Sequence, residues 1–511
     1  MADAAQIDAK LAAALPLRSL YAVGGRVRDE VRSELDGVPR PAKDLDYVVV
    51  GVELDELIER LRTLGPADVV GASFAVVKST IGGTTVDVAL PRRERSTGTG
   101  HRDFSVEWGP AVSLEDDLGR RDFRMNMLAR ALPGRELVDP YGGAADIAAR
   151  RIDVLRDAAF EEDPLRMLRA CQFAARFGFA PTERTLAAMR AAAPLVATVS
   201  PERIHDELAK LFEHAAKPSV GIELMRSSGI LPLVLPEVAE GIGVGQNRFH
   251  AYDVYEHALA TVDATPPGDV VLRVAALLHD VGKPRSKTGD GPDSHFYRHE
   301  VVGEEMAREA LARLRFSNDD VADVSRLVRN HMYVADPDHE AKAIRRFVQR
   351  VGPELLPRQF ALRAADVIGS GLPKRDDHNE RFEARVWALL AERPPLSVRD
   401  LAIGGEEAIA VLVDAGRLPR GSQGGPEVGR LLATLLDAVV DDPDANTRET
   451  LLELAKAYAA GVPPRSPGNG DSIRGAPAWS GDGPGPAGST GNDRPAPETP
   501  AVPRRADPTD P

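Results

Sequence analysis

Two carboxylates, Asp44 and Asp46, stand two positions apart just before the apolar run 47–50. The run is rich in valine, which predicts a buried β-strand. Residues two apart in a strand point to one face of the sheet, so these side chains could hold two divalent cations about 3.5–4 Å apart. Such a pair of ions supports phosphoryl or nucleotidyl transfer. The alternative is an ordinary solvated strand end.

A glycine pair, Gly24 and Gly25, follows another apolar run at residues 21–23. Glycines that leave a strand and open a helix bring backbone N–H groups and the positive helix end toward the turn, where a phosphate can bind. The distance along the chain to Asp44 is what a strand, a short helix and a second strand require. The pair therefore predicts a phosphate cradle beside the carboxylates, with a simple turn as the alternative.

Two further pairs have helical spacing. Asp122 and Asn126 lie four apart, so on one helix face they could meet a single ribose; the alternative is a cap and helix pair. Asp163 and Arg166 lie three apart where acidic residues and Pro164 predict a helix start. The alternative is an ion pair on the helix surface that stabilises the helix by roughly 0.2–0.5 kcal/mol.

Most of the eleven histidines fall between residues 250 and 339. His279 and Asp280 end an apolar helix just before a glycine and a proline, where side chains from several helices can converge. Imidazole and carboxylate together suit Mn, Fe, Ni, Zn or Mg. Segments that carry histidine or aspartate recur at residues 250–257, 279–284, 295–300, 330–331 and 363–366, and this recurrence favours a metal centre.

The elements that must position the first cluster form a small α/β unit. Apolar spacing predicts helices over residues 1–20 and 53–64 and strands over 74–79 and 84–90. Asp87 on the last strand is a candidate third carboxylate, and a strand-surface aspartate is the alternative. Residues 91–104 are polar and glycine-spaced, which predicts a loop.

Composition limits the class of protein. A chain of 511 residues can bury several cores, and the single cysteine, Cys171, excludes an intramolecular disulfide. The chain has no apolar run of membrane-spanning length, so we expect a cytoplasmic protein without membrane contact. The net charge of −14 argues against non-specific coating of nucleic acid, but local arginines could still grip tRNA.

Taken together, the motifs of roughly residues 18–235 resemble the class II tRNA nucleotidyltransferase and bacterial poly(A) polymerase family. The resemblance rests on the order of Gly24-Gly25-x-x-Arg28-Asp29, Asp44-x-Asp46, Arg120-Arg121-Asp122-Phe123-x-x-Asn126, Asp139-Pro140-x-Gly142-Gly143, Glu162-Asp163-x-x-Arg166 and Ser200-Pro201-Glu202-Arg203-Ile204. Met127 stands where that family commonly has a small residue.

The resemblance implies a head of the DNA polymerase β type, in which the catalytic Asp44 and Asp46 hold Mg²⁺. It also implies a set of nucleotide-binding residues, with Arg121 and Asp122 at the ribose and triphosphate: Gly24, Gly25, Arg28, Arg121, Asp122, Asn126, Asp163, Arg166 and Arg169. Asp163 and Arg166 fit base selection physically. An ionised aspartate only accepts and an arginine only donates, which matches the pairing edges of cytosine and adenine and rejects the carbonyls of uracil and guanine.

The histidine-rich region resembles the HD metal-dependent phosphohydrolase superfamily. By this resemblance His257, His279, Asp280 and Asp366 are metal ligands, while His299 and His331 belong to the same site or to a second metal. The metal would be Ni, Mn, Fe, Zn or Mg²⁺. Such appended domains imply phosphohydrolase activity on nucleotides or 2′,3′-cyclic phosphates.

The expected fold is an α/β nucleotidyltransferase head with a small mixed sheet, followed by mostly α-helical domains. We expect a head at residues 1–145, a neck at 146–240, an HD domain at 241–374, a helical region at 375–461 and a disordered tail at 462–511.

The leading hypothesis for function is addition of CMP and AMP from CTP and ATP to the 3′ end of tRNA, with a poly(A) polymerase or a CC-only or A-only enzyme as alternatives. A different class of function is an HD phosphohydrolase with an RNA-binding head. A non-enzymatic tRNA chaperone is a third hypothesis.

Overall fold

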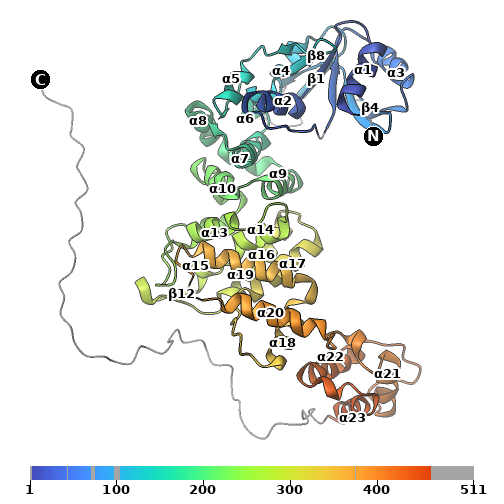
Figure 1. Cartoon of the computed structure of the whole chain (residues 1–511), viewed down its shortest axis with the longest axis vertical. Helices are drawn as coiled ribbons and strands as arrows, with labels where there is room; N and C mark the ends of the chain where they lie inside the picture. The colour runs from blue at the N-terminus through green and yellow to red at the C-terminus, as the bar shows by residue number, and fades with distance from the viewer. Residues whose placement is uncertain (1–2, 43, 71–74, 97–103, 375, 462–511) are drawn as a thin grey trace, which may run out of the picture.

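The computed structural model describes residues 3–42, 44–70, 75–96, 104–374 and 376–461. The chain forms an elongated stack in which a mixed α/β head, a helical neck, a larger helical body and a small terminal helical lobe follow one another (Figure 1). Within the described ranges, none of the helices is both long enough and apolar enough to cross a membrane. The predicted tail at 462–511 lies outside these ranges.

The head is built on a seven-stranded sheet with the order β3-β4-β5-β2-β1-β8-β9. Only the β2 and β5 pair is parallel; the other neighbours are antiparallel. The strands are β1 (Leu20–Val23), β2 (Asp46–Val49), β3 (Ala67–Val70), β4 (Val76–Ile81), β5 (Thr84–Ala89), β8 (Ala129–Ala131) and β9 (Leu137–Val138). The mixed sheet confirms the expected head architecture.

Helices pack on this sheet through the apolar positions that the sequence pattern marks. In α3, Leu57 and Leu61 are fully buried while the charged residues between them face outward. The head helices are α1 (Ala4–Ala14), α2 (Gly25–Asp36), α3 (Leu54–Arg62), α4 (Leu114–Gly119) and α5 (Gly143–Ala148).

Two local expectations were wrong. Residues 92–96 are not a loop: β6 (Arg92–Ser96) and β7 (Phe104–Trp108) pair as an antiparallel ribbon outside the main sheet. Asp122 and Asn126 do not share an α-helix either, because α4 ends at Gly119 and only the short 3₁₀ turn η2 (Arg124–Asn126) follows. The polar composition of residues 92–96 gives no strand signal. The four-residue spacing of Asp122 and Asn126 favours a helix, although a turn produces the same contact.

The neck is helical, and its central helix, α7, buries Phe173 edge-on against Phe123 of the head with ring centroids 5.9 Å apart. Its helices are α6 (Ala159–Glu162), α7 (Leu165–Phe177), α8 (Glu183–Ala192), α9 (Pro201–His214), α10 (Pro218–Ser227), α11 (Leu231–Val234) and α12 (Pro236–Ala239). Short strands β10 (Arg151–Ile152) and β11 (Ala180–Pro181) pair in parallel beside them.

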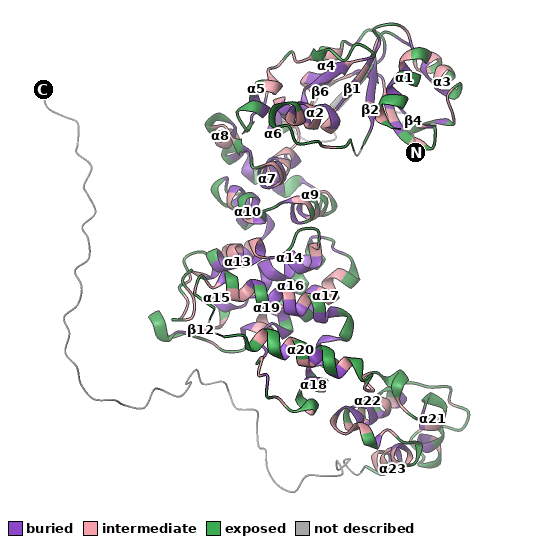
Figure 2. Ribbon diagram, in the orientation of Figure 1, coloured by how far each residue is buried: buried purple, intermediate pink, exposed green. Residues whose placement is uncertain are grey.

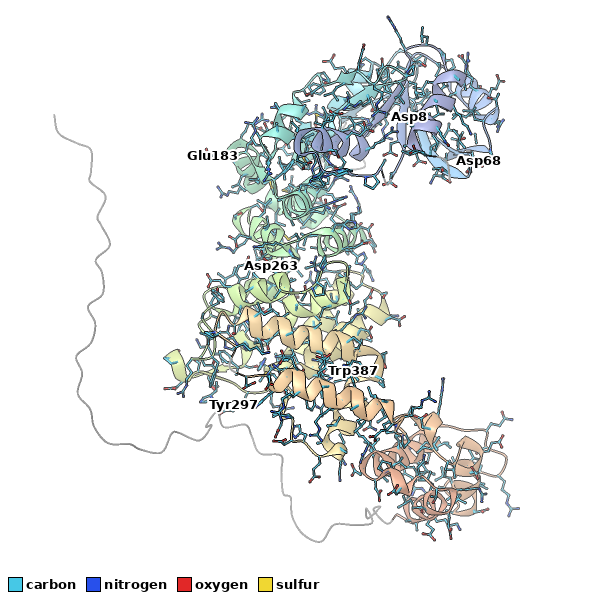
Figure 3. The ribbon with its side chains drawn as sticks, in the orientation of Figure 1. Asp8, Asp68, Glu183, Asp263, Tyr297 and Trp387 are labelled. Atoms are coloured by element: carbon cyan, nitrogen blue, oxygen red, sulfur yellow. The ribbon has the colours of Figure 1, made fainter. Side chains whose placement is uncertain are left out.

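Polar groups join the neck to the body below it. Asp263, which Figure 3 labels at this junction, accepts hydrogen bonds from the N–H and hydroxyl of Ser219 at 3.0 and 2.6 Å. The buried Arg273 donates to the carbonyls of Phe212 and Ala215 at the end of α9, both at 2.6 Å. These bonds satisfy carbonyls that the helix itself leaves unpaired.

The body carries the histidine-rich segments on helices around one apolar core. The helices are α13 (Val254–Asp263), α14 (Val270–Leu278), α15 (Lys283–Ser286), α16 (His299–Arg313), α17 (Asn318–Asn330), α18 (Ala341–Val351), α19 (Leu356–Gly369) and α20 (His378–Ala391), with the short ribbon β12 (Lys287–Thr288) and β13 (His295–Phe296) beside them. Helix α20 contributes Phe382, Val386 and Leu389 to this core.

The terminal lobe has an apolar core of its own, formed by residues 403–459. It contains α21 (Gly405–Asp414), α22 (Pro426–Asp441) and α23 (Arg448–Ala459). Figure 2 shows buried residues lining the inner faces of these helices and exposed residues on their outer faces. Charged groups join the lobe to the body: Arg346 pairs with Asp441 at 2.5 Å, and Arg345 donates to the carbonyl of Val440 at 2.6 Å.

Candidate active site and metal centre

The head carboxylates meet at one edge of the sheet. Asp46 opens β2, and its neighbour across the parallel β2–β5 pair is Asp87. Asp44 is exposed two residues before the strand rather than inside it. Burial and the charges of Asp44 and Asp87 raise the pKa of Asp46, and the positive charge of Arg121 only partly offsets them. A bound cation beside Asp46 would relieve this repulsion.

The glycine turn lies directly against this edge. Gly24 has φ 77° and ψ −149°, a conformation that only glycine adopts easily, and it is the N-cap of α2. A Cβ at Gly24 would lie 3.2 Å from Asp46 Oδ2 and 3.6 Å from Arg121 Nη1. The N-terminal backbone of α2, the carboxylates and a guanidinium therefore share one small space.

A buried carboxylate that the sequence reasoning missed holds the arginine pair in place. Asp117 of α4 is 1% exposed; it accepts from Arg120 Nη2 at 2.8 Å and from Arg121 Nη2 at 3.1 Å. Burial opposes ionisation, but the charges of Arg120 and Arg121 outweigh it and lower the pKa of Asp117. The i,i+3 and i,i+4 spacing of these residues was the signal available in the sequence.

Asp122 and Asn126 meet even though no α-helix links them. The Asn126 amide donates to Asp122 Oδ1 at 2.9 Å, and Arg28 Nη1 donates to Asn126 Oδ1 at 2.9 Å. Arg169 of the neck donates to Asp122 Oδ2 at 2.9 Å. Burial opposes ionisation of Asp122, but the Arg169 charge and the Asn126 hydrogen bond lower its pKa. This network joins α2, η2 and α7.

In the neck, Asp163 and Arg166 bind different partners. Asp163 is half-buried and accepts from Arg203 Nη2 at 3.1 and 3.2 Å. Arg166 donates to the carbonyl of Arg120 at 2.7 Å. The pair is therefore not an ion pair within α7, and Arg166 instead ties the neck to the segment of the head that carries Arg120 and Arg121.

In the body, the predicted ligands converge from α13, α19, the turn after α14, the start of α16 and the end of α17. His257 Nε2 lies 3.0 Å from His279 Nε2, 3.2 Å from Asp280 Oδ2 and 3.2 Å from Asp366 Oδ1. Asp280 Oδ1 faces a second set, 3.3 Å from His299 Nε2 and 3.5 Å from His331 Nε2. Asp280 Oδ2 thus lies against a first group that contains His257 and His279, and Oδ1 lies against a second group that contains His299 and His331.

The histidine tautomers fit a bound cation. His299 Nδ1 and His331 Nδ1 each lie 2.7 Å from a main-chain carbonyl, which can only accept, so each Nδ1 carries the proton. The two Nε2 atoms lie 3.2 Å apart. Each is therefore the ring nitrogen available to a metal ion bound between them.

Electrostatics separate the two groups. Burial disfavours the charged form of His279, but Asp280 and Asp366 outweigh it and raise its pKa to about 10. Burial lowers the pKa of His331 to about 4. Lys283, which the sequence reasoning did not single out, lies with its Nζ 2.6 Å from Asp280 Oδ2. The carboxylates of Asp280 and Asp366 therefore favour a positive charge between them and His279.

Three family models match the chain. The model described as "Poly A polymerase head domain" matches residues 20–153, "Probable RNA and SrmB- binding site of polymerase A" matches 178–242, and "HD domain" matches 249–369. The matches follow the head, the neck and the body in order.

Full-length relatives and solved structures agree with these matches. The A-adding tRNA nucleotidyltransferase of Deinococcus radiodurans is 38% identical over 343 residues, which cover 64% of this chain and 75% of that protein. The multifunctional CCA protein of Verminephrobacter eiseniae is 36% identical over 428 residues, covering 81% and 96%. The CCA-adding enzyme of Bacillus stearothermophilus, solved with CTP, superimposes with a TM-score of 0.63 at 22% identity over 90% of this chain and 97% of that one, which establishes a common fold.

Proposed function

Because the chain belongs to the family of tRNA nucleotidyltransferases and bacterial poly(A) polymerases, we propose that it adds CMP and AMP from CTP and ATP to the 3′ end of tRNA, without a template and in the cytoplasm. The observation that carries this function is the shared space of Asp46, Asp87, the Gly24 turn and Arg121. A nucleotidyl transfer needs metal-binding carboxylates and a phosphate cradle in contact, and the proximity of Asp46 to the Gly24 turn supports this assignment.

The residues of the head divide the work of transfer. Asp44 and Asp46 would hold Mg²⁺, which activates the primer 3′-hydroxyl and steadies the leaving pyrophosphate when bound. The Gly24 and Gly25 backbone at the start of α2 receives phosphate oxygens, and Arg121 adds a positive charge beside them. Asp122 is held by Arg169 and Asn126, which makes it a fixed acceptor for a ribose hydroxyl.

The neck supplies base selection. Arg203 holds the Asp163 carboxylate in position. This carboxylate accepts a hydrogen bond from the exocyclic amine of cytosine or adenine, and it repels the carbonyl oxygens of uracil and guanine. Arg166 donates toward the ring nitrogen beside that amine. Its contact with the Arg120 carbonyl links base selection to the segment that carries the triphosphate-binding Arg121.

The product is tested by primer extension. Transcripts of one tRNA ending before CCA, after the first C and after CC should each be extended with CTP and ATP to the complete CCA end, and UTP and GTP should be refused. Extension of only the CC-ended transcript would instead indicate the A-only activity for which the Deinococcus relative is named. Long adenosine tails would indicate a poly(A) polymerase.

A second activity is favoured by the histidine cluster. We infer that His257, His279, Asp280 and Asp366 hold one divalent metal ion, and that His299 and His331 share Asp280 toward a second. Such a centre suits hydrolysis of phosphate esters, including nucleotides and 2′,3′-cyclic phosphates. Two readouts test it: phosphate release from nucleotides, and opening of 2′,3′-cyclic phosphates to the 2′- or 3′-monoester. Each should depend on Ni²⁺, Mn²⁺, Fe²⁺, Zn²⁺ or Mg²⁺ and be removed by a chelator. Neither product with any of these ions would contradict this activity.

A further inference from the structure

One histidine beside the metal cluster has no role in the mechanism above. His250 lies in the segment between α12 and α13, seven residues before His257. Its ligand nitrogen lies within 4.8 Å of the ligand atoms of both His257 and Asp366. Its ring meets the ring of His257 nearly at right angles, with centroids 4.8 Å apart. The imidazole series through His257, His279, His331 and His299 therefore begins at His250.

The orientation of His250 matches that of the predicted ligands. In His279, His299 and His331, Nδ1 lies 2.7–2.8 Å from an oxygen of the residue three positions earlier, which leaves Nε2 facing the cluster. His250 repeats the pattern: its Nδ1 lies 3.2 Å from the side-chain oxygen of Asn247. An outer hydrogen bond of this kind fixes the tautomer and aim of a metal-bound imidazole.

The backbone holds this histidine against α19, which carries Asp366. The Ala251 N–H donates to the carbonyl of Ser370 at 2.9 Å. The Tyr252 ring packs on Gly371, where a Cβ would come within 2.6 Å of it and φ is +71°. Two contacts with the residues just after α19 therefore fix the backbone that follows His250.

We propose that His250 is a further ligand of the metal centre in the body, binding a divalent cation together with His257 and Asp366. Ligand bonds of about 2.0–2.2 Å place opposite donors on one ion about 4.4 Å apart at most, so this group needs to close by only a few tenths of an ångström. Asp366 Oδ1 already faces His257, while its Oδ2 is occupied by Arg363 at 3.2 Å. The inference rests on the proposed metal-dependent phosphohydrolase.

The test measures metal binding by the full chain rather than activity alone. Metal-free wild type, His250→Gln and the control His295→Gln are titrated with Co²⁺ by calorimetry and absorption. His295 is exposed and stacks on Tyr297, which Figure 3 labels at the edge of the body. His250→Gln should weaken Co²⁺ binding at least about tenfold, since even outer partners of a ligand contribute about 10–100-fold. His295→Gln should bind as wild type does.

A ligand replacement distinguishes coordination from mere support. His250→Cys loaded with Co²⁺ should show a thiolate-to-metal absorption band, because the sulfur then bonds the ion directly. An unchanged Co²⁺ affinity in His250→Gln, or no such band in a metal-loaded His250→Cys, would overturn the assignment of His250. Failure of the wild type itself to bind Co²⁺ would instead overturn the proposed metal centre.

Discussion

At the residue scale, the candidate active site of the head places like charges near Asp46. The pKa of Asp46 is raised by burial and by Asp44 and Asp87. A carboxyl group whose pKa rises on folding is less stable ionised in the folded chain than in the unfolded one. The ionised carboxyl group therefore lowers the free energy of unfolding at neutral pH. This loss disappears once the pH falls below the group's unfolded pKa of about 4.

Asp46→Asn should separate activity from stability. Nucleotide addition should fall at least about 10³-fold, roughly 4 kcal/mol of transition-state stabilisation, because a metal ligand is lost. In metal-free buffer at pH 7 the melting temperature should be equal to or above that of wild type, and any gain should shrink below about pH 4. Single-turnover extension and thermal denaturation measure the two effects. Asp68→Asn, an exposed aspartate of β3 that Figure 3 labels, is the control and should change neither.

Asp163→Ala should collapse base discrimination more than rate. The variant lacks the acceptor for the exocyclic amine and also the charge that repels uracil, so the ratio of kcat/KM for CTP over UTP should fall by at least about tenfold. Arg166→Ala should weaken CTP and ATP alike. Glu183→Ala, an exposed acidic residue of α8 in the neck, should leave the ratio unchanged. A wild-type ratio in a folded Asp163→Ala protein would contradict the role of Asp163.

At the element scale, short helices aim the side chains that the motifs contain. Helix α4 begins with a capping box at Ser113 and Asp116, which fixes the direction in which Asp117 faces. Asp117 then grips Arg120 and Arg121 just beyond the helix end. The arginine that reaches the glycine turn is therefore positioned by an element of six residues.

Asp117→Asn should act through Arg121. The KM for CTP and ATP should rise about tenfold with a smaller change in kcat, because Arg121 loses its charged partner. Unfolding free energy should fall by about 1.5–3 kcal/mol at pH 7, the worth of a charge-assisted hydrogen bond. Since the pKa of Asp117 is lowered on folding, its stabilisation is present above pH 4 and lost as pH falls further. Steady-state kinetics at pH 7 measure the KM values. Denaturation at pH 7 and again below pH 4 measures the loss of stabilisation.

The neighbouring carboxylate offers a matched control. Asp116 is more exposed and binds Ser113 and Arg93 on the outer side of α4. Asp116→Asn should lower stability through the weakened cap by about 1 kcal/mol while leaving the KM values unchanged. If both variants raise the KM equally, Asp117 acts only by stabilising the helix.

The sequence predicts elements where period and composition agree, and fails where tertiary contacts decide. Helix α3 and strands β4 and β5 follow from apolar spacing. Strand β6 does not, because its residues are all polar and carry no alternating apolar face. Strand β7 does carry such a signal, since Phe104, Val106 and Trp108 alternate with polar residues, and the sequence reasoning missed it.

Ligand types and their order in the body are readable as a motif, but the partition around the two oxygens of Asp280 depends on how α13, α14, α16, α17 and α19 pack. The role of Arg203 likewise appears only when its partner Asp163 is brought into contact. The spacing of Asp117 to Arg120 and Arg121, in contrast, is present in the sequence.

At the scale of the whole molecule, the two sites stand at opposite sides of the neck. Figure 1 shows α7, α9 and α10 between the head and the body, while one continuous apolar core runs from Ile7 to Leu389. The core couples folding of the two parts. It does not bring the carboxylates of the head into contact with the histidines of the body, so their chemistry can be separated by substitution.

His279→Ala and Asp46→Asn should therefore form a reciprocal pair. His279→Ala removes a metal ligand from the body, so bound metal and phosphate release should fall while nucleotide addition stays within about twofold of wild type. Asp46→Asn should do the reverse. Because the core is shared, each preparation must melt as wild type does before the activities are compared, which excludes global unfolding as the cause. Loss of both activities in a fully folded His279→Ala protein would show that the body's metal centre supports the head, and the two sites would then be one coupled system.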